Sequence, residues 1–149
     1  MTKKLTKQGS GGVKKSKTTR DKAHRKRLEK ELDDLFSKIV HKSWGYKCAW
    51  PGCKNVGTAA HHYFHKAQGL IARWSLENGI LLDYGHHFFQ VHSKGDTEPI
   101  RDKIIEKIGI DAFMKLKSDV RKTWKPTLED LEDLKHKWTI LYQSVKLEK

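Results

Sequence analysis

The sequence predicts an α+β protein that is mostly helical and contains one small sheet. Apolar residues recur at helical spacing over residues 21–41 and again over residues 98–147. Two short apolar segments, in residues 55–63 and 78–84, have the length and the flanking turn residues of strands. Six of the nine histidines fall within the 34 residues 59–92, around this predicted sheet. Imidazoles titrate near neutrality and are costly to bury, so such a cluster requires a chemical reason.

Length and charge predict one domain that follows a basic tail. The chain has 149 residues, a formal charge of +13 and a pI of about 9.7. Residues 1–30 hold twelve lysines and arginines but only two acids, which accounts for +10 of that charge. Residues 1–19 are predicted to be a disordered basic tail, either solubilising or phosphate-seeking. Residues 20–149 are predicted to form a single domain, with a core at 44–95 and a helical part at 98–147.

Composition also limits the class of partner. A pI above about 9 indicates a nucleic-acid partner. No apolar run approaches the ~20 residues of a membrane span, so no membrane association is expected. No apolar stretch follows the basic N-terminus, so it does not have the pattern of a signal peptide, and a cytoplasmic location is expected.

The helices are predicted from their apolar stripes and end signals. The first helix spans residues 21–41, with Thr19 or Asp21 as its cap. Residues 64–77 are expected to be a loop and residues 86–94 a short helix. Three helices follow the core, and the first of these spans 98–109, with Pro99 near its start. Asp111 is expected to cap the second, with Met114 facing inward.

A capping-box pattern begins the last predicted helix, residues 127–147. Thr127 is followed three residues later by Asp130, so each side chain can bond the other residue's backbone N–H. The apolar stripe of this helix is either core or a dimer surface, and a homodimer therefore remains one predicted arrangement.

Two cysteines flank a turn. Cys48 and Cys53 lie on either side of Pro51-Gly52, a turn signal that predicts a knuckle offering two thiolates to one ion. A disulfide is the alternative. The neighbouring histidines and the absence of a secretion signal favour a reduced compartment and a metal.

The first histidine doublet suits hydrolysis of a phosphodiester with one metal ion. This chemistry needs an ion at the scissile phosphate and a separate neutral imidazole that takes a proton from water. Adjacent residues at a strand end point to opposite faces, so His61 can face the ion and His62 the water. His87 and His92, on the short helix, can supply further ligands. Asn78, between the two elements, can fix the loop by side-chain hydrogen bonds.

The order of these residues resembles the HNH nuclease motif, with its ββα-metal fold. Asn78 follows His62 by 16 positions, and His87 follows Asn78 by nine. More narrowly, residues 48–92 resemble phage NinG/Rap-type recombination nucleases. The resemblance implies that His61, His87 and His92 hold the catalytic ion, that His62 is the general base and that Asn78 fixes the loop. It also implies a DNA endonuclease, with branched or recombination intermediates as substrates, in the cytoplasm of a phage-infected host.

A second site is implied by a departure from the family pattern. Many zinc-stabilised HNH proteins carry another cysteine pair five and eight residues after the asparagine, where this chain has Asp83 and His86. Zinc accepts carboxylate and imidazole as well as thiolate, so these two with Cys48 and Cys53 could hold a structural Zn²⁺. In the alternative the site is lost, Asp83 is solvated and His86 simply begins the short helix.

Three further residues are predicted to contact DNA. Arg73 could clamp the scissile phosphate, or it could stack on Trp74 or form a surface ion pair. Lys66 and His65 could contact phosphate or could be ordinary surface residues. The identity of the catalytic ion stays open, because cells commonly supply Mg²⁺ or Mn²⁺ whereas an all-histidine site favours Zn²⁺, Ni²⁺ or Mn²⁺.

Two other functions are compatible with the sequence: the first does not need His62, and in the second nicking is secondary. One is a zinc-stabilised DNA-binding module that holds DNA without cutting it. The other is a small accessory protein of a larger recombination or packaging enzyme. An intact set of base and ligands favours the nuclease over both.

Overall fold

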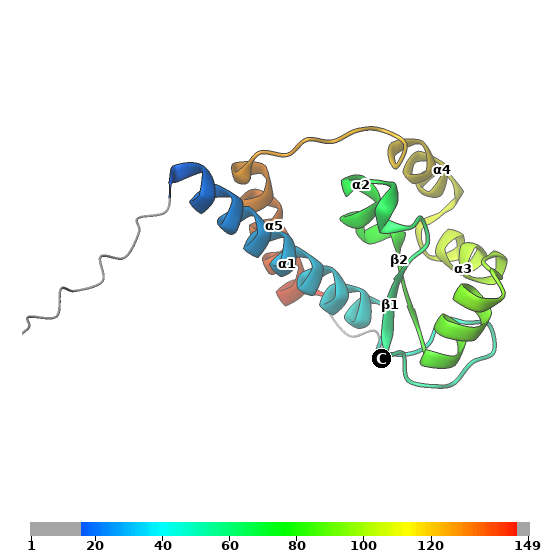
Figure 1. The fold of residues 1–149 in the computed structure, drawn as a ribbon. Helices are drawn as coiled ribbons and strands as arrows, with labels where there is room; N and C mark the ends of the chain where they lie inside the picture. Colours follow the sequence, from blue (N-terminus) through cyan, green and yellow to red (C-terminus); the bar gives the residue numbers. More distant parts are fainter. Residues whose placement is uncertain (1–15, 146–149) are drawn as a thin grey trace, which may run out of the picture.

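The computed structural model describes residues 16–145 and has the predicted mixed, mostly helical architecture (Figure 1). A long helix, α1 (Lys17–Ser43), leads into an antiparallel hairpin of β1 (Ala59–His62) and β2 (Gly79–Leu82). A π-helix, η3 (His86–Ser93), follows directly. The chain then forms α3 (Glu98–Ile108), α4 (Ile110–Asp119) and α5 (Leu128–Ser144), so the one preceding and three following helices are confirmed.

The first helix begins earlier than its apolar stripe indicates. Its first residue is Lys17, and Ser16 is the cap, whose hydroxyl accepts a hydrogen bond from the Thr19 N–H at 3.3 Å. The predicted caps Thr19 and Asp21 are therefore wrong, and so is the tail boundary at residue 19. A polar first turn has no apolar periodicity, which is why the pattern missed it. The predicted disorder of residues 1–15 falls outside the described residues.

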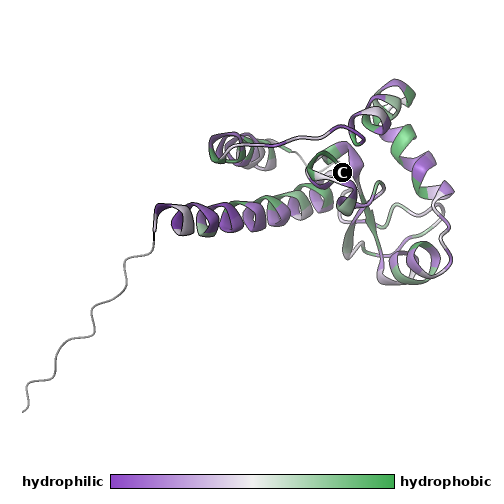
Figure 2. Cartoon of the chain, turned by 45° about the horizontal axis from the view of Figure 1, so that its top comes forward, coloured by the Kyte–Doolittle hydropathy of each residue, from purple (hydrophilic) through white to green (hydrophobic). Residues whose placement is uncertain are grey.

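Two apolar clusters form the core on either side of the hairpin. The first joins α1, β2 and α5 through residues such as Leu32, Leu81 and Leu131, all fully buried. The second joins β2, η3 and α3 through Ile80, Val91 and Ile100 and reaches the cysteine knuckle. In Figure 2 hydrophilic residues dominate the start of α1, and hydrophobic ones become frequent toward the sheet.

The hairpin approaches α1 too closely for a side chain at one position. A Cβ atom on Gly79 would lie 2.4 Å from Val40 Cγ2, so only glycine fits there without displacing the helix. Gly79 pairs with His62, and Ile80 pairs with His61. Because the hairpin register is fixed against α1, the positions of both histidines are fixed with it.

Several local predictions are corrected. The segment 64–77 contains three short helical turns rather than a plain loop: η1 (Lys66–Gln68), α2 (Leu70–Arg73) and η2 (Leu76–Asn78). Gly109 precedes α4 in place of the expected Asp111 cap, and Met114 is exposed. The capping box of Thr127 and Asp130 is confirmed. α5 packs along α1 and not on α3 and α4, because Leu131 and Trp138 complete the first cluster.

Candidate metal centre and histidine pocket

The end of β1 directs two adjacent histidines to opposite faces of the hairpin. His61 is buried, with 8% of its surface exposed, and its ring lies against the rings of His87 and His92. The His62 ring instead stacks on Phe36 of α1, with centroids 4.1 Å apart and planes 5° apart. The alternation of side chains along a strand produces this division, as the sequence predicted.

Three imidazoles converge on one point. His61, His87 and His92 each offer a nitrogen, and these atoms all lie within 4.8 Å of one another. The Nε2 atoms of His87 and His92 are 3.1 Å apart. A tetrahedral zinc ion with bonds of about 2.0–2.1 Å separates its nitrogen ligands by about 3.3 Å, so the spacing fits an ion. His92 is exposed, which leaves one side of the group open to solvent.

The π-helical turn of η3 explains how His87 and His92 meet. In an α-helix of 3.6 residues per turn, side chains five residues apart point about 140° away from each other. In η3 the wider i→i+5 repeat puts residues five apart on one face. The departure from an α-helix therefore makes His92 a partner of His87.

Burial and mutual proximity favour the neutral forms of His61 and His87. Burial, followed by the neighbouring His87 and His92, lowers the pKa of His61 to about 3. Burial and His92 also lower the pKa of His87. A neutral imidazole carries the lone pair that a metal ion requires, so this group is suited to ligation at neutral pH.

The opposite histidine has a fixed tautomer. His62 Nε2 lies 2.9 Å from the carbonyl oxygen of Arg73. A carbonyl can only accept, so Nε2 carries the proton and Nδ1 keeps a lone pair. Burial lowers the pKa of His62, although the bond to the Arg73 carbonyl opposes that shift. His62 is therefore a neutral base that is separate from the ligand group.

Asn78 ties the segment between the strands to itself. Its Nδ2 donates to the carbonyls of Phe64 and Ala72, both at 2.8 Å, and its Oδ1 accepts from the Phe64 N–H at 2.7 Å. The side chain is fully buried, and these are the loop-fixing bonds that the sequence predicted. Because Ala72 precedes Arg73, the same bonds help to hold the carbonyl that orients His62.

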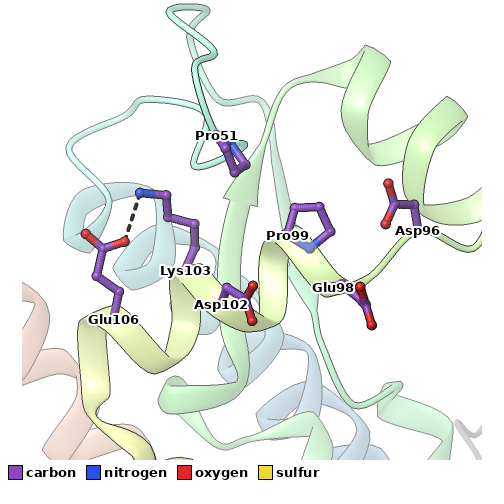
Figure 3. A pocket seen from close by; sticks show the side chains of 7 residues that line it. All are labelled: Pro51, Asp96, Glu98, Pro99, Asp102, Lys103 and Glu106. Carbon is purple, nitrogen blue, oxygen red and sulfur yellow. Dashed lines mark hydrogen bonds and ion pairs between the residues drawn. The ribbon is translucent and has the colours of Figure 1, made fainter.

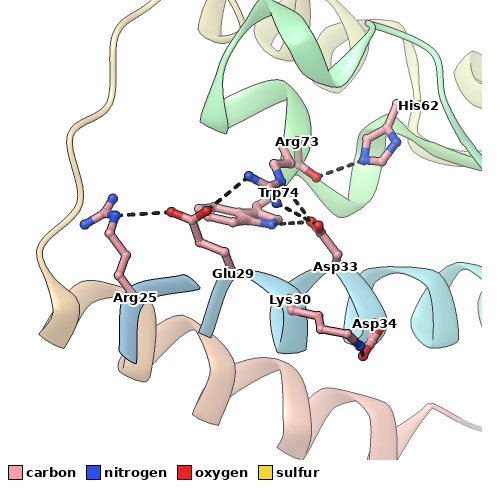
Figure 4. A network of polar contacts seen from close by, with 8 residues as sticks. All are labelled: Arg25, Glu29, Lys30, Asp33, Asp34, His62, Arg73 and Trp74. Carbon is pink, nitrogen blue, oxygen red and sulfur yellow. Dashed lines mark hydrogen bonds and ion pairs between the residues drawn. The ribbon is translucent and has the colours of Figure 1, made fainter. Parts of the chain in front are cut away.

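The side chain of Arg73 turns away from the histidines and toward α1 (Figure 4). Its Nε and one terminal nitrogen donate to the two oxygens of Asp33, at 2.9 and 2.7 Å, and its guanidinium lies over the Trp74 ring. Trp74 Nε1 donates to the same carboxylate at 3.0 Å. Arg73 was expected either to clamp a phosphate or to stack on Trp74 or form an ion pair, and the structure shows the ion pair together with the stacking. Arg73 contributes to the site through its carbonyl.

Asp33 and Phe36, both on α1, are parts of this arrangement that the sequence did not indicate. Asp33 holds Arg73, whose carbonyl bonds His62, and Phe36 supports the His62 ring from beneath. Burial raises the pKa of Asp33, but hydrogen bonds from Arg73 and Trp74 outweigh it and lower the pKa overall. The carboxylate is thus ionised at neutral pH and α1 is pinned to the histidine segment.

Replacing Asp33 by asparagine should lower the free energy of unfolding by about 1–2 kcal/mol, because a half-buried guanidinium loses its paired carboxylate. Urea denaturation measures this change. The matched control is Asp34→Asn, since the neighbouring Asp34 pairs with Lys30 across an exposed helix surface and should contribute less than about 1 kcal/mol. Equal losses in both variants would show that the Asp33–Arg73 pair has no special role.

The three clustered histidines and the separate His62 all line one cavity of about 250 Å³. Its lining consists of Ala60, His61, His62, His65, Lys66, His87 and His92. The predicted phosphate contacts Lys66 and His65 are thus at this cavity, whereas Arg73 is not among the lining residues. His65 Nδ1 accepts from the Ala67 N–H, so its Nε2–H remains to donate to an anion. The cavity thus brings together three candidate ligands, a candidate base and the cationic Lys66.

A second group of four ligands assembles on the other side of η3. Cys48, Cys53, Asp83 and His86 each offer an atom within 4.8 Å of the others, and both cysteines are free. Cys48 Sγ lies 3.6 Å from His86 Nδ1, and Cys53 Sγ lies 3.3 Å from Asp83 Oδ2. A tetrahedral zinc ion separates sulfur from nitrogen or oxygen ligands by about 3.5 Å. The four residues therefore fit a closed zinc site.

Surrounding residues orient these ligands. Asn55 Nδ2 donates to Asp83 Oδ2 at 2.7 Å, and the His86 N–H donates to Asp83 Oδ1 at the same distance. Although burial raises the pKa of Asp83, these bonds lower it to about 2. Trp50 stacks on the His86 ring, with centroids 4.8 Å apart. Asn55 and Trp50 were not predicted, because neither Trp50, between the cysteines, nor Asn55, two residues after the second, has a distinctive spacing.

A larger hollow, of about 460 Å³, lies between the knuckle and α3 (Figure 3). Its lining is mainly acidic, with Asp96, Glu98, Asp102 and Glu106 around Lys103, which pairs with Glu106 at 2.8 Å. Its exposed carboxylates are held by no buried partner, so the smaller histidine-lined cavity is the stronger candidate site.

Within residues 16–145, no helix combines the length and the apolarity that crossing a bilayer requires. Comparison of the chain with protein-family models, with curated proteins and with solved structures finds no match.

Proposed function

We propose that this chain is a metal-dependent endonuclease of the HNH type that hydrolyses phosphodiester bonds in DNA. One observation carries the proposal. Three imidazoles within ligand distance of one another, and a fourth imidazole held in one tautomer, line the same cavity. This separation of ligands from base is what one-metal hydrolysis of a phosphodiester requires.

The ligand group suits a catalytic ion better than a structural one. His61, His87 and His92 provide three protein ligands and leave a further position for water or substrate, as catalytic sites do. A divalent ion bound there would supply positive charge to the scissile phosphate and to the leaving 3′ oxygen.

In this proposal His62 is the general base. Its Nδ1 takes a proton from a water molecule, and the water oxygen bonds to phosphorus while the bond from phosphorus to the 3′ oxygen breaks. The imidazolium that forms is stabilised by the Arg73 carbonyl at Nε2. The products are a 5′ phosphate and a 3′ hydroxyl.

Other residues position the substrate and the scaffold. Lys66 and His65 line the cavity and would hold the phosphates on either side of the scissile bond. A Zn²⁺ at Cys48, Cys53, Asp83 and His86 would fix the knuckle against η3. The formal charge of +13 supports DNA as the partner. Branched recombination intermediates in a phage-infected cytoplasm are the substrates we propose, and cutting both strands would take two copies of the chain.

Cleavage of supercoiled plasmid tests the proposal directly. The full chain is incubated with Mg²⁺, Mn²⁺, Ni²⁺ or Zn²⁺, beside His87→Ala and the matched control His136→Ala, whose histidine is exposed on α5. Wild type and His136→Ala should nick plasmid with at least one ion, and His87→Ala should not. If wild type binds plasmid and a branched junction but cuts neither with any ion, the chain is a DNA-binding module without catalysis.

A further inference from the structure

Three aromatic rings are exposed together beside the histidine cavity. Tyr84, Phe88 and Phe89 have 66%, 47% and 53% of their surface exposed. The rings of Tyr84 and Phe88 lie 5.7 Å apart and only 3° from parallel, and Phe89 meets both edge-on, at 6.4 and 5.2 Å. We refer to Tyr84, Phe88 and Phe89 as the aromatic platform.

The aromatic platform is not part of the core. Among the described residues, its rings make aromatic contacts only with each other, and the buried side chain of this helix is Val91. Each large aromatic ring can bury roughly 150–250 Å² against a partner, so leaving three exposed forgoes much stabilisation. An exposed cluster of this kind marks a binding surface.

Its place in the chain identifies the partner. Phe88 and Phe89 lie on η3 between His87 and His92, which both line the cavity, so the platform and the cavity share one helical element. Residues 84–93 contain no aspartate or glutamate, and the exposed Lys94 follows them. Lys66 lies at the cavity itself. A flat apolar surface with cationic surroundings complements a nucleobase attached to a phosphate backbone.

We infer that the aromatic platform stacks unpaired bases of single-stranded DNA next to the scissile phosphate. The inference rests on the proposed function and specifies its substrate class. In an intact duplex the faces of each base are covered by neighbouring bases, so only an unpaired base can stack on Phe88 or Tyr84. Because the three rings are only 66%, 47% and 53% exposed, the area that they offer is well below the ~800 Å² that each partner contributes to a standard protein interface.

Binding of single-stranded DNA tests this inference separately from cleavage. The probe is an oligonucleotide carrying a fluorescent adenine analogue, used alone and annealed to its complement. The full-length chain carries His62→Gln in every sample, so that the strand stays intact. Phe88→Leu removes the ring but keeps the apolar volume, and Phe88→Trp keeps a ring. The matched control is Met114→Ala, since Met114 on α4 is 53% exposed, like Phe89.

Phe88→Leu should weaken single-strand binding about 10-fold and abolish the quenching of the analogue, because base–aromatic stacking contributes strongly to such affinity. Phe88→Trp and Met114→Ala should bind like the parent, and duplex affinity should not change in any variant. If Phe88→Leu binds single-stranded DNA as tightly as the parent does, the inference about the aromatic platform is wrong, even if wild type cuts plasmid. Quenching that depends on Phe88 supports the platform even if wild type cuts nothing.

Analytical ultracentrifugation tests whether a second copy of the chain, and not single-stranded DNA, covers the aromatic platform. If the chain is a dimer that Phe88→Leu converts to a monomer, with single-strand binding unaltered, the platform is a protein interface and the inference is wrong.

Discussion

Replacement of His62 by glutamine should lower the rate of DNA cleavage about 10²- to 10⁴-fold, which is the usual contribution of a positioned general base. A glutamine can still donate a hydrogen bond toward the Arg73 carbonyl and fill part of the space against Phe36, so the fold should be kept. It offers no basic nitrogen to water. Cleavage of supercoiled plasmid, measured with the ion that supports the fastest wild-type reaction, gives the rate, and filter binding on the same samples gives the DNA affinity.

His65→Gln is the matched control for this experiment, because His65 lines the same cavity but has the role of a phosphate contact. It should weaken DNA binding modestly and leave most of the rate at saturating DNA. A His62→Gln variant that cuts at the wild-type rate would remove His62 from the mechanism. Equal loss of binding and cleavage in that variant would assign His62 to DNA contact.

Removal of the structural ion should have the second large effect. Loss of zinc from the group formed by Cys48, Cys53, Asp83 and His86 should lower the melting temperature by at least about 10 °C, since structural zinc contributes many kcal/mol to folding. The second core cluster includes Cys48 and reaches η3 through Val91, so the catalytic ligands should loosen with the knuckle. Zinc content by mass spectrometry and melting by circular dichroism measure both quantities.

Asp83→Ala and Asp96→Ala form a matched pair for this test. Asp83 is a ligand in the predicted zinc group, whereas Asp96 is an exposed aspartate at the acidic hollow. Asp83→Ala should lose zinc and melt earlier, and Asp96→Ala should keep both properties. If wild type contains no zinc and a chelator leaves its melting unchanged, the hydrogen bonds among Cys53, Asn55 and Asp83 hold the knuckle without an ion.

The cysteine knuckle and the division of the first histidine doublet could be predicted because local spacing determines them, whereas Asp83 and His86 were expected at the knuckle only from the resemblance to zinc-stabilised HNH proteins. His61 and His62 diverge at any strand end, and a turn at Pro51-Gly52 brings Cys48 toward Cys53 in any fold. The antiparallel hairpin then brings Asp83 and His86 to the knuckle. The starts of α3 and α5 followed from Pro99 and from the capping box, which act through neighbouring residues alone, whereas α5 ends at Ser144, before the predicted end at residue 147.

The residues that orient His62 could not be found in the same way. Asp33 lies 40 positions before Arg73, and Phe36 lies 26 positions before His62. On the sequence, Phe36 is one member of an ordinary apolar stripe and Asp33 one of several acids on a helix. Their roles arise only when α1 docks on the hairpin at Gly79. Arg73 was ambiguous for the same reason, since its partner belongs to a distant element.

The π-helical turn has a consequence for how metal sites are searched for and modified. Pairs of metal-binding histidines on helices are usually sought three or four positions apart, and such a filter would pass over His87 and His92. A π-turn is equivalent to one extra residue in an α-helix. Deleting a single residue between the two histidines, such as Gln90, would restore α-helical winding and a four-residue spacing. The pair would still share a face, and the residues after it would keep their orientation, because the deleted residue is the one that the π-turn absorbs. A one-residue deletion at this turn would therefore preserve both the pairing of the two histidines and the orientation of α3.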